Sequence, residues 1–446
     1  MKEKIKIAIF GGSFDPFHVG HRRVVEGLVR LGKFDRIIVM PLGLAPHKKQ
    51  YMTPAGYRTE MARLSLRDLP GVEVSDYEIN RPGKYSYTVD TIDYFKKETK
   101  LDYFQAKHSK ARKKKSKRGK VRTVREEQKF QADLLQEIIG SNLKVKLYLV
   151  YGSDALDTIE SWHEPAHLMK SANLLICRRG GESIDHMQVR ADYLRTRYGA
   201  KIKFFDIDET TMSATDLRQQ IVQGEIPDQA LSTSVEKFIL KNGVYRLRED
   251  MTYLSPAERV KLGVYEKEVR KMVSRSRLIH SLNVMQYAVH LARCHGYDLF
   301  KAAVTGMLHD IAKQMDISRQ YRYATRIGKL SPINKNIAHG PAGAYYIKKF
   351  LHVGDQEILD ALVFHTTSRP AATTLDKIIF LADKLEYGRP FKNLEKIRQA
   401  ADHDLDQGMR YCLAEVREAL AKRSKIGHPM TMAAIDYHDA QLGIEE

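Results

Sequence analysis

The sequence predicts two domains of different fold class, an α/β domain with a parallel sheet and helices on both faces, followed by an all-α domain. In the first part, short apolar runs alternate with helical segments, a pattern typical of parallel sheets. After about residue 250, apolar residues recur at helical spacing and no convincing strand intervenes. The 446 residues also exceed one ordinary core, since a domain averages about 150 residues.

The α/β domain is expected over residues 1–248 and opens with a strand at residues 5–12, which ends in a pair of glycines. A helix is predicted at residues 22–31. Further strands are predicted at residues 35–42, 146–153 and 173–179, each ending in glycine or polar residues. Parallel strands place their carboxyl ends along one edge of the sheet, so the functional loops are expected there.

The all-α domain is expected over residues 249–446. We place the border in the segment Glu249–Glu258, where Ser255 precedes Pro256. A serine followed by proline predicts a helix N-cap with proline in the first helical position. Strong helical periods follow, for example at residues 280–296, 302–314 and 375–386.

The basic charge of the chain is mostly local. Of the net charge of +19, eleven positive charges lie in the segment Lys107–Arg125, which contains no acidic residue. We predict that this segment belongs to a disordered surface insertion over about residues 100–143. A weak contact with nucleic acid is the alternative, since such a run binds phosphates without sequence preference. The segment lacks the interleaved aromatic residues that stack on bases.

Other features of the composition indicate a cytoplasmic protein. The N-terminal residues read as a first strand rather than a secretory signal. No apolar run approaches the roughly 18 residues that span a bilayer, so we expect no membrane partner. The three cysteines lie far apart and form no CxxC pair, which favours buried free thiols in a reducing compartment. The sequence leaves a homo-oligomer open.

A glycine turn with two histidines follows the first strand, where residues 11–21 read GGSFDPFHVGH. The glycines allow backbone amides to approach a phosphate, and the next helix start favours negative charge. His18 and His21 lie three apart, so both can donate hydrogen bonds to a phosphate from one helix face. The predicted phosphate-binding residues of the turn are Gly11, Gly12, Ser13, Phe14 and Asp15.

This segment resembles the (H/T)xGH nucleotidyltransferase superfamily, which implies a Rossmann-like nucleotidyltransferase fold. Residues 212–218 (MSATDLR) resemble the second motif of that superfamily, which implies that Ser213, Thr215 and Arg218 bind the ATP polyphosphate. Ser213 is also a sensible helix N-cap, the structural alternative for that residue. The sequence PHK at residues 46–48 resembles a loop that carries a phosphate-binding lysine, here Lys48.

The order of further motifs is similar to that of nicotinate-nucleotide adenylyltransferases. By this resemblance, Trp162 stacks on a pyridine ring, Asp154 holds a ribose hydroxyl and Thr88 lies in the acceptor site. The implied reaction is in-line attack of nicotinate mononucleotide on the α-phosphorus of ATP, with Mg²⁺ on the polyphosphate. The family has proline where this chain has Arg179, which leaves nicotinate versus nicotinamide preference open.

The all-α domain carries an ordered series of nitrogen and oxygen donors. A set of histidine and aspartate without thiolate suits Fe²⁺, Mn²⁺ or similar divalent cations. The adjacent His309 and Asp310 can reach one centre, and the carboxylate can bridge two cations that activate water and hold a phosphoryl group. The predicted metal ligands are His280, His309, Asp310, His339, His365 and Asp383.

Residues 262–436 resemble the YqeK-type HD hydrolases, a family associated with symmetrical cleavage of diadenosine tetraphosphate to two ADP. The resemblance rests on HD at residues 309–310, HTT at 365–367 and LADKLE at 381–386. It implies a metal-dependent hydrolase for a dinucleoside polyphosphate, with two metals. Lys313 and Arg389 are additional phosphate-binding candidates.

Two alternatives stay open from the sequence. The first is a different (H/T)xGH acceptor combined with another nucleotide HD phosphohydrolase. The second is a nucleic-acid-associated protein that acts through Lys107–Arg125.

Overall fold

The computed structural model describes residues 4–43, 52–81, 87–115, 133–134, 136–179, 184–207, 212–329, 335–390, 393–422 and 427–441. The chain forms two compact units. The first comprises residues 1–47, 58–217 and 227–232, and the second comprises residues 48–57, 218–226 and 233–446. The border after residue 248 stays a prediction.

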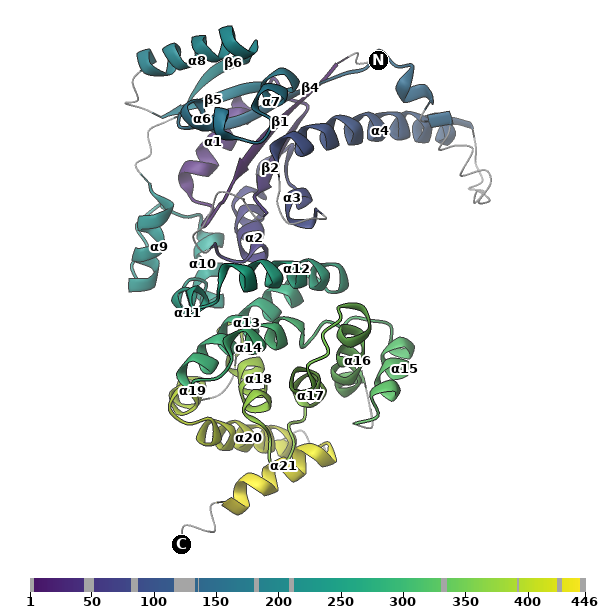
Figure 1. The fold of residues 1–446 in the computed structure, drawn as a ribbon, viewed down its shortest axis with the longest axis vertical. Coiled ribbons are helices and arrows are strands. Elements are labelled where there is room, and N and C mark those ends of the chain that lie inside the picture. Colours follow the sequence, from purple (N-terminus) through teal and green to yellow (C-terminus); the bar gives the residue numbers. More distant parts are fainter. Residues whose placement is uncertain are drawn as a thin grey trace. The chain divides into compact units, whose positions relative to one another are not determined.

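A six-stranded parallel sheet forms the centre of the first unit (Figure 1). Its strand order is β3-β2-β1-β4-β5-β6, the order of a Rossmann-like fold. The predicted fold class is therefore confirmed for this unit. The strands are β1 (Lys4–Gly12), β2 (Arg36–Pro41), β3 (Val72–Val74), β4 (Lys144–Gly152), β5 (Asn173–Arg179) and β6 (Lys201–Ile207).

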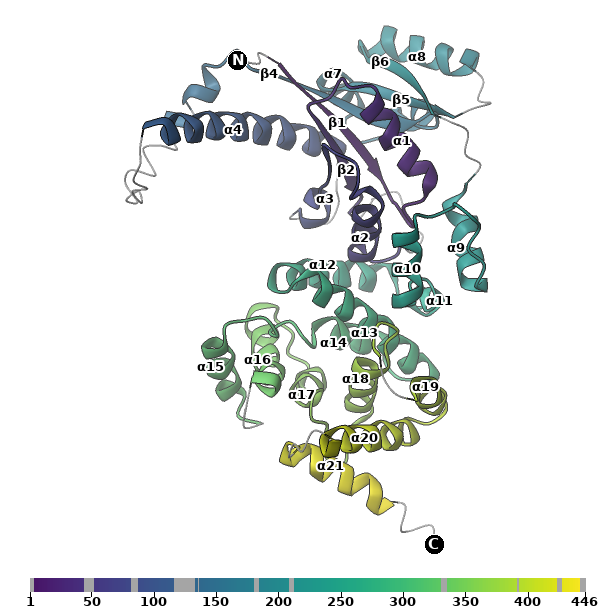
Figure 2. The same ribbon diagram turned by 180° about the vertical axis from the view of Figure 1, so that it is seen from behind.

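Helices cover both faces of this sheet. Helices α4 and α7 lie in front of it in Figure 1, and α1 lies in front in the reverse view of Figure 2. Ile7 and Ile9 of β1 join one apolar cluster with Ile92 and Phe95 of α4. The helices assigned to this unit in whole or part are α1 (Val19–Arg30), α2 (Ala55–Leu66), α3 (Tyr77–Asn80), α4 (Thr88–Lys115), α6 (Ala155–Thr158), α7 (Pro165–Ser171), α8 (Ile184–Tyr198) and α9 (Ala214–Gln223).

Two strands were missed by the sequence patterns. Strand β3 has only three residues, too few to show a periodicity. Strand β6 reads KIKFFDI, and its exposed lysines alternate with buried Ile202 and Phe205. Among the described strands it pairs only with β5, so it is an edge strand of the sheet. A half-buried edge strand carries charge on its open side and lacks a continuous apolar run.

The prediction of a disordered insertion over residues 100–143 is wrong for part of that range. Helix α4 continues to Lys115, and Phe104 on it is buried. Leu134 and Leu143 are also buried and join the same apolar cluster as Phe104. These apolar side chains anchor both ends of the predicted insertion, while residues 116–132 lie outside the described part of the chain.

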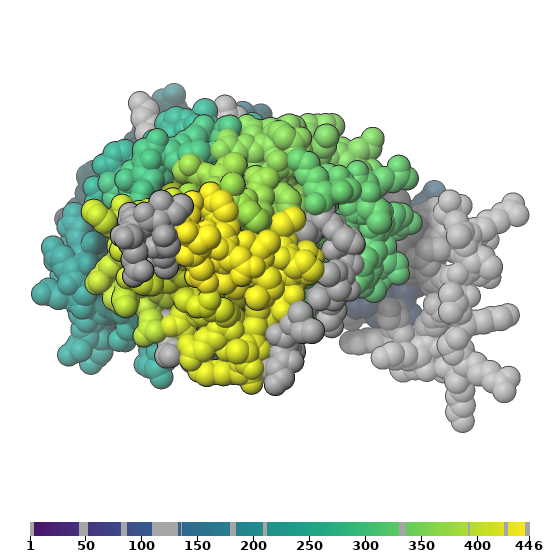
Figure 3. All heavy atoms as spheres, turned by 90° about the horizontal axis from the view of Figure 1, so that it is seen from below, coloured from purple at the N-terminus to yellow at the C-terminus, as the bar shows by residue number. Residues whose placement is uncertain are grey.

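Helices joined by turns and loops form the second unit, and no strand occurs among its described residues, which confirms the predicted all-α class. Helix α12 begins as predicted, with Ser255 as N-cap and Pro256 as its first residue. Figure 3 shows, in yellow, the surface formed by the C-terminal helices α20 and α21. The described helices of the second unit are α10 (Thr233–Asn242), α11 (Arg248–Thr252), α12 (Pro256–Met272), α13 (Arg275–Cys294), α14 (Leu299–Leu308), α15 (Ile317–Ile327), α16 (Lys335–Phe350), α17 (Gln356–Phe364), α18 (Thr374–Leu385), α19 (Leu394–His403), α20 (Leu405–Lys422) and α21 (Pro429–Ala440).

None of the helices that the structure describes combines the length and the apolarity needed to cross a lipid bilayer.

Candidate active sites

The glycine turn lies at the point where the sheet reverses its strand order. Strand β1 ends at Gly11 and Gly12, and β4, its neighbour on the other side from β2, ends at Gly152. Phe10 pairs with Val150 in the parallel register, so both strands end at the same edge. Open α/β sheets bind ligands in the crevice outside this kind of switch point.

His18 and His21 lie together at the start of α1. Nδ1 of His18 accepts from the amide of Gly20 at 3.1 Å, and Nδ1 of His21 accepts from the amide of His18 at 3.2 Å. Their ring centroids are 3.8 Å apart. Because each Nδ1 acts as an acceptor, each neutral ring carries its hydrogen on Nε2. The helix start therefore offers two imidazole N–H donors side by side.

The Phe14 ring packs behind these histidines. Its centroid lies 5.0 Å from that of His21 and 5.3 Å from that of Phe10, and the side chain is only 1% exposed. A Cβ added at Gly12 would lie 2.6 Å from the Phe14 ring, so glycine is required there. A contact of Phe14 with ATP would therefore have to use its backbone. Asp15 is likewise buried.

Arg58, a residue that sequence reasoning missed, holds the glycine turn in place. This arginine is buried at 2% exposure. Its Nη1 donates to the carbonyl of Ser13 at 2.7 Å, and its Nη2 donates to the carbonyl of Leu42 at 2.8 Å. The guanidinium thus joins the loops that follow β1 and β2. Charge-assisted hydrogen bonds of this kind are stronger than neutral ones.

Two of the predicted acceptor-site residues are linked through Tyr151, at the end of β4. The Trp162 ring meets the Tyr151 ring edge-on, with centroids 5.0 Å apart and planes at 85°. Burial raises the pKa of the Tyr151 phenol, and the neighbouring Thr88 side chain partly offsets this rise. Asp154 is exposed, two residues beyond the end of β4. The acceptor-side residues thus lie in the segment that follows β4 and at the start of α4.

Three of the remaining predicted phosphate-binding residues lie at or on helix α9, and the fourth lies outside the described residues. Ser213 Oγ accepts from the amides of Thr215 at 3.2 Å and Asp216 at 3.4 Å, so it caps α9. Thr215 is exposed in the first turn of that helix. Arg218 follows on α9 and belongs to the second unit. Lys48 lies outside the described residues.

The six predicted metal ligands of the all-α domain lie on three helices or at the C-terminal ends of two others, with Asp310 in the turn after α14. His280 lies on α13, His339 on α16 and Asp383 on α18. His309 and His365 are the C-cap residues of α14 and α17. Ligand atoms of His280, His309 and Asp383 lie within 4.8 Å of one another, and so do those of His309, Asp310 and His365. His309 belongs to both groups.

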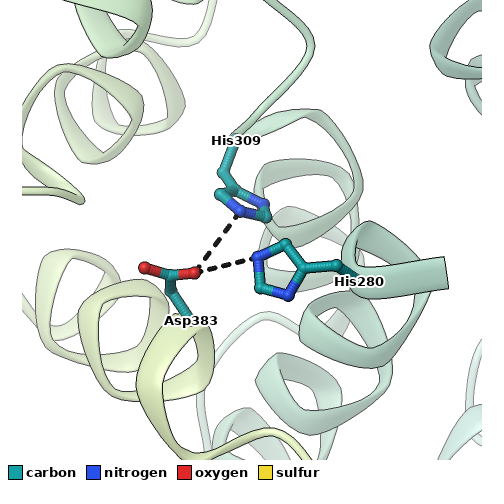
Figure 4. Close-up of side chains that lie close together, drawn as sticks. All are labelled: His280, His309 and Asp383. Carbon is teal, nitrogen blue, oxygen red and sulfur yellow. Dashed lines mark ion pairs between the residues drawn. The ribbon is translucent and has the colours of Figure 1, made fainter. Parts of the chain in front are cut away.

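Figure 4 shows the first of these groups, in which His280 and His309 point toward the Asp383 carboxylate. Oδ1 of Asp383 lies 3.0 Å from Nε2 of His280 and 3.7 Å from Nε2 of His309. On the other side, Oδ1 of Asp310 lies 3.1 Å from Nε2 of His339. Nε2 of His339 is also 3.0 Å from Nε2 of His365. The six side chains therefore converge.

The hydrogen bonds made by Nδ1 of two histidines show which nitrogen of each ring can bind a cation. Nδ1 of His309 lies 2.8 Å from the Gly306 carbonyl, and Nδ1 of His365 lies 2.7 Å from the Leu362 carbonyl. Carbonyls accept only, so each Nδ1 carries the hydrogen and each Nε2 presents its lone pair. Among the described residues, the buried Nε2 of His309 has no hydrogen-bond partner. Such a lone pair suits a metal ion.

Glu386 orients His280 from behind, a role that sequence reasoning missed. Its Oε1 lies 3.0 Å from Nδ1 of His280, and its Oε2 accepts from Nδ2 of Asn283 at 2.8 Å. Burial opposes the charged form of His280, but hydrogen bonds to Asp383 and Glu386 outweigh it and raise its pKa. The pKa of His280 is raised because these two carboxylates stabilise a positive charge beside them. A carboxylate behind a ligand histidine is common at metal sites.

Cationic side chains line the same site. Arg277 donates to Asp310 at 2.7 Å, and Arg389 donates to Asp383 at 2.8 Å. Nζ of Lys313 lies 3.2 Å from Nε2 of His339, and burial lowers the pKa of this lysine. Burial favours neutral Asp310, yet His309 and His339 keep its pKa well below the usual range. The site therefore combines carboxylates that could bind cations with surrounding cationic side chains suited to a polyphosphate.

Close packing of two helices brings His339 to His365. A Cβ at Gly340 would lie 2.7 Å from the Leu362 carbonyl and 3.4 Å from Cε1 of His365. Glycine at this position therefore lets α16 approach the end of α17.

Known protein families match both parts of the chain. Residues 9–220 match the cytidylyltransferase-like family, and residues 277–388 match the HD domain family. A probable nicotinate-nucleotide adenylyltransferase of Clostridium botulinum is 27% identical over 242 residues, which cover 54% of this chain and 98% of the relative. The symmetrical bis(5'-nucleosyl)-tetraphosphatase of Halalkalibacterium halodurans is 35% identical over 170 residues, which cover 37% of this chain and 90% of the relative. The chain belongs to the HD domain family, and its residues 9–220 are similar to the cytidylyltransferase-like family.

A solved structure from Clostridium acetobutylicum, described as a predicted HD superfamily hydrolase involved in NAD metabolism, is 31% identical. It covers 40% of this chain and 96% of its own length, with a TM-score of 0.38. The family matches and the curated relatives, taken together, show a nucleotidyltransferase domain similar to nicotinate-nucleotide adenylyltransferases at residues 9–220 and an HD hydrolase domain at residues 277–388.

Proposed function

We propose that the first unit transfers AMP from ATP to nicotinate mononucleotide, which gives deamido-NAD and pyrophosphate. The observation that carries the proposal is the pair of imidazole donors, His18 and His21, beside the glycine turn at the sheet switch point. The name of the Clostridium botulinum relative supports the choice of acceptor.

The reaction needs no protein nucleophile. The 5′-phosphate of the mononucleotide attacks the α-phosphorus of ATP in line, and pyrophosphate leaves. Nε2–H of His18 and His21 would donate to oxygens on which negative charge builds up. Lys48 and Arg218 are proposed to bind the polyphosphate, together with the Ser213 and Thr215 hydroxyls. Bound Mg²⁺ supplies charge neutralisation on the ATP phosphates.

Trp162, Asp154 and Thr88 are proposed to bind the acceptor. Trp162 is partly buried and meets the Tyr151 ring edge-on, and a face of its indole would stack on the pyridine ring. Asp154, exposed beyond β4, can accept hydrogen bonds from ribose hydroxyls.

An acceptor screen tests this assignment. Purified full-length protein is incubated with ATP and Mg²⁺ and, separately, with nicotinate mononucleotide, nicotinamide mononucleotide or phosphopantetheine. We expect the highest kcat/KM with nicotinate mononucleotide and a loss of pyrophosphate release in His21→Ala. Equal or better use of another acceptor would replace the proposed substrate, and full activity of His21→Ala would refute the site.

We further propose that the second unit is a hydrolase that binds two divalent cations, Fe²⁺ or Mn²⁺, and cleaves diadenosine tetraphosphate symmetrically. The observation that supports this proposal is the pair of overlapping groups of candidate ligands that share His309. The cations would supply Lewis acidity for the attack of water on a phosphoryl group. Arg277, Lys313 and Arg389 are proposed to bind the remaining phosphates.

Product analysis tests the second assignment. The full chain is assayed with diadenosine tetraphosphate after chelation and reloading with Fe²⁺ or Mn²⁺. We expect ADP as the sole nucleotide product and no hydrolysis by His309→Ala. A mixture of ATP and AMP would contradict symmetrical cleavage, and preference for a different nucleotide would identify another phosphohydrolase.

A further inference from the structure

A second cluster of metal-ligating side chains lies on α13 and α19, apart from the HD residues. His290 and Cys294 are one helical turn apart on α13, and Asp402 lies near the end of α19. Their ligand atoms all lie within 4.8 Å of one another. His290 follows His280 by ten residues on the same helix, a separation of about 15 Å along its axis. The cluster is therefore distinct from the HD site.

The distances suit a tetrahedral cation. Nε2 of His290 lies 3.8 Å from Sγ of Cys294 and 3.0 Å from Oδ1 of Asp402. Metal–ligand bonds of about 2.0–2.3 Å place the ligand atoms of a tetrahedral zinc site about 3.3–3.8 Å apart. Only small side-chain adjustments are needed. The combination of imidazole, thiolate and carboxylate favours a borderline cation over Mg²⁺ or Ca²⁺.

A buried carboxylate supports the histidine from behind. Oδ2 of Asp250 lies 3.0 Å from Nδ1 of His290, and the whole Asp250 residue is only 4% exposed. Arg293 donates from Nε to the other oxygen of Asp250. This arrangement fixes the ring and directs Nε2 toward Cys294 and Asp402. It is the carboxylate–histidine pairing that surrounds many metal ions in proteins.

We propose that His290, Cys294 and Asp402 form a surface site for a divalent transition cation such as Zn²⁺, with its fourth position open to solvent. Cys294 is exposed and the Asp402 side chain is 40% exposed, so a cation can reach the site. A cation there would link the end of α13 to the end of α19.

The metal-free cluster is held by a charged histidine. Burial opposes the charge on His290, but Asp250 and Asp402 outweigh it and raise the pKa of His290 to about 9. The two carboxylates thus require a positive charge between them, which either a proton or a cation can supply. The test therefore has to separate a metal site from an ion pair.

Cobalt spectroscopy of the full chain distinguishes a metal site from an ion pair. A thiolate bound to Co²⁺ gives a near-ultraviolet charge-transfer band, whereas the proposed HD ligands include no sulfur. We expect the band in the wild type and in His309→Ala, and we expect Cys294→Ser to lose it. Cys412→Ser is the matched control that keeps the band, since Cys412 is fully buried.

The carboxylates are tested by titration of the same band. We expect Asp402→Asn to raise the Kd for Co²⁺ at least ~10-fold, and Asp250→Asn to raise it ~10–100-fold, as outer-shell partners typically do. Asp404→Asn, which changes a nearby carboxylate outside the cluster, should leave the Kd unchanged. No band in the wild type, or a band that survives Cys294→Ser, would overturn the proposal and leave His290 as an ion-pair residue.

Discussion

The amide of His18 donates to Nδ1 of His21, and the two imidazole rings lie with their centroids 3.8 Å apart. Nδ1 of His18 in turn accepts from the amide of Gly20. Nδ1 of each ring therefore stabilises the helix start, and Nε2 of each ring is the atom proposed to donate to a phosphate. Substitutions can separate these two roles.

We predict that His18→Asn keeps the structure and loses the transferase reaction. Asparagine is a good N-cap, and its Oδ1 can accept from Gly20 as Nδ1 does. It cannot replace the Nε2–H donor, so kcat should fall about 10²–10³-fold. His18→Ala should lose the cap as well, at a cost of about 1 kcal/mol. Steady-state kinetics and urea denaturation measure both effects, and an active His18→Asn would exclude the donor role.

Two glycines of α16 give a matched pair for the packing of the HD site. A Cβ at Gly340 would clash with the Leu362 carbonyl, whereas a Cβ at Gly343 would meet side chains at 3.6 Å or more. Gly340→Ala should therefore destabilise the second unit by about 1–3 kcal/mol. Gly343→Ala should be neutral or stabilising, since alanine favours helix. Thermal unfolding of both variants checks this difference, and equal melting temperatures would contradict it.

Glu386 should tune metal affinity without contacting the metal. Glu386→Gln keeps the shape but weakens the hold on Nδ1 of His280. We expect the Kd for Mn²⁺ to rise about 10–100-fold. High Mn²⁺ concentration should restore most of the hydrolysis rate, because the ligands themselves are intact. Loss of activity that no metal concentration restores would place Glu386 in the chemistry instead.

The ion pair between Arg22 and Asp68 should make the stability of the α/β unit depend on pH. Arg22 donates to both carboxylate oxygens, and this lowers the pKa of Asp68 to about 2. A lowered carboxyl pKa stabilises the fold above the unfolded-state value of about 3.9. That stabilisation is lost as the pH falls toward the folded-state pKa.

The Asp68 carboxylate is solvent-exposed, so Asp68→Asn should cost only about 0.5–1 kcal/mol at pH 7 and progressively less between pH 4 and pH 2. Fluorescence of Trp162, the single tryptophan, reports unfolding of this unit. Asp93→Asn, at another exposed carboxylate, is the control. A difference between wild type and Asp68→Asn that persists at pH 2 would contradict the assignment.

The structural features that depend on a local sequence pattern could be predicted from the sequence. Alternating runs indicated the α/β fold, the Ser255-Pro256 pair placed the start of α12, and the HD series identified side chains that the fold brings together. The short strand β3 and the charged edge strand β6 contain no apolar run from which a strand could be predicted. The helical part of the predicted insertion was missed because the basic run Lys107–Arg125 dominates the composition of the segment, whereas the burial of Phe104 is a tertiary contact.

Supporting residues could not be predicted because their partners lie far along the chain. Arg58 binds a carbonyl 45 residues earlier, and Glu386 contacts a histidine 106 residues earlier. His290 had no assigned role in the sequence, since Asp402 reaches it only through the packing of α19 on α13. Such contacts follow from tertiary structure and leave no local spacing to detect.

Paired assays of two single variants test most directly whether one chain carries two independent phosphate chemistries. Deamido-NAD formation and diadenosine tetraphosphate hydrolysis are measured on the same preparations of wild type, His21→Ala and His309→Ala. We predict that His21→Ala loses only the first reaction and that His309→Ala loses only the second. Loss of both reactions in either variant, or of neither, would contradict the account.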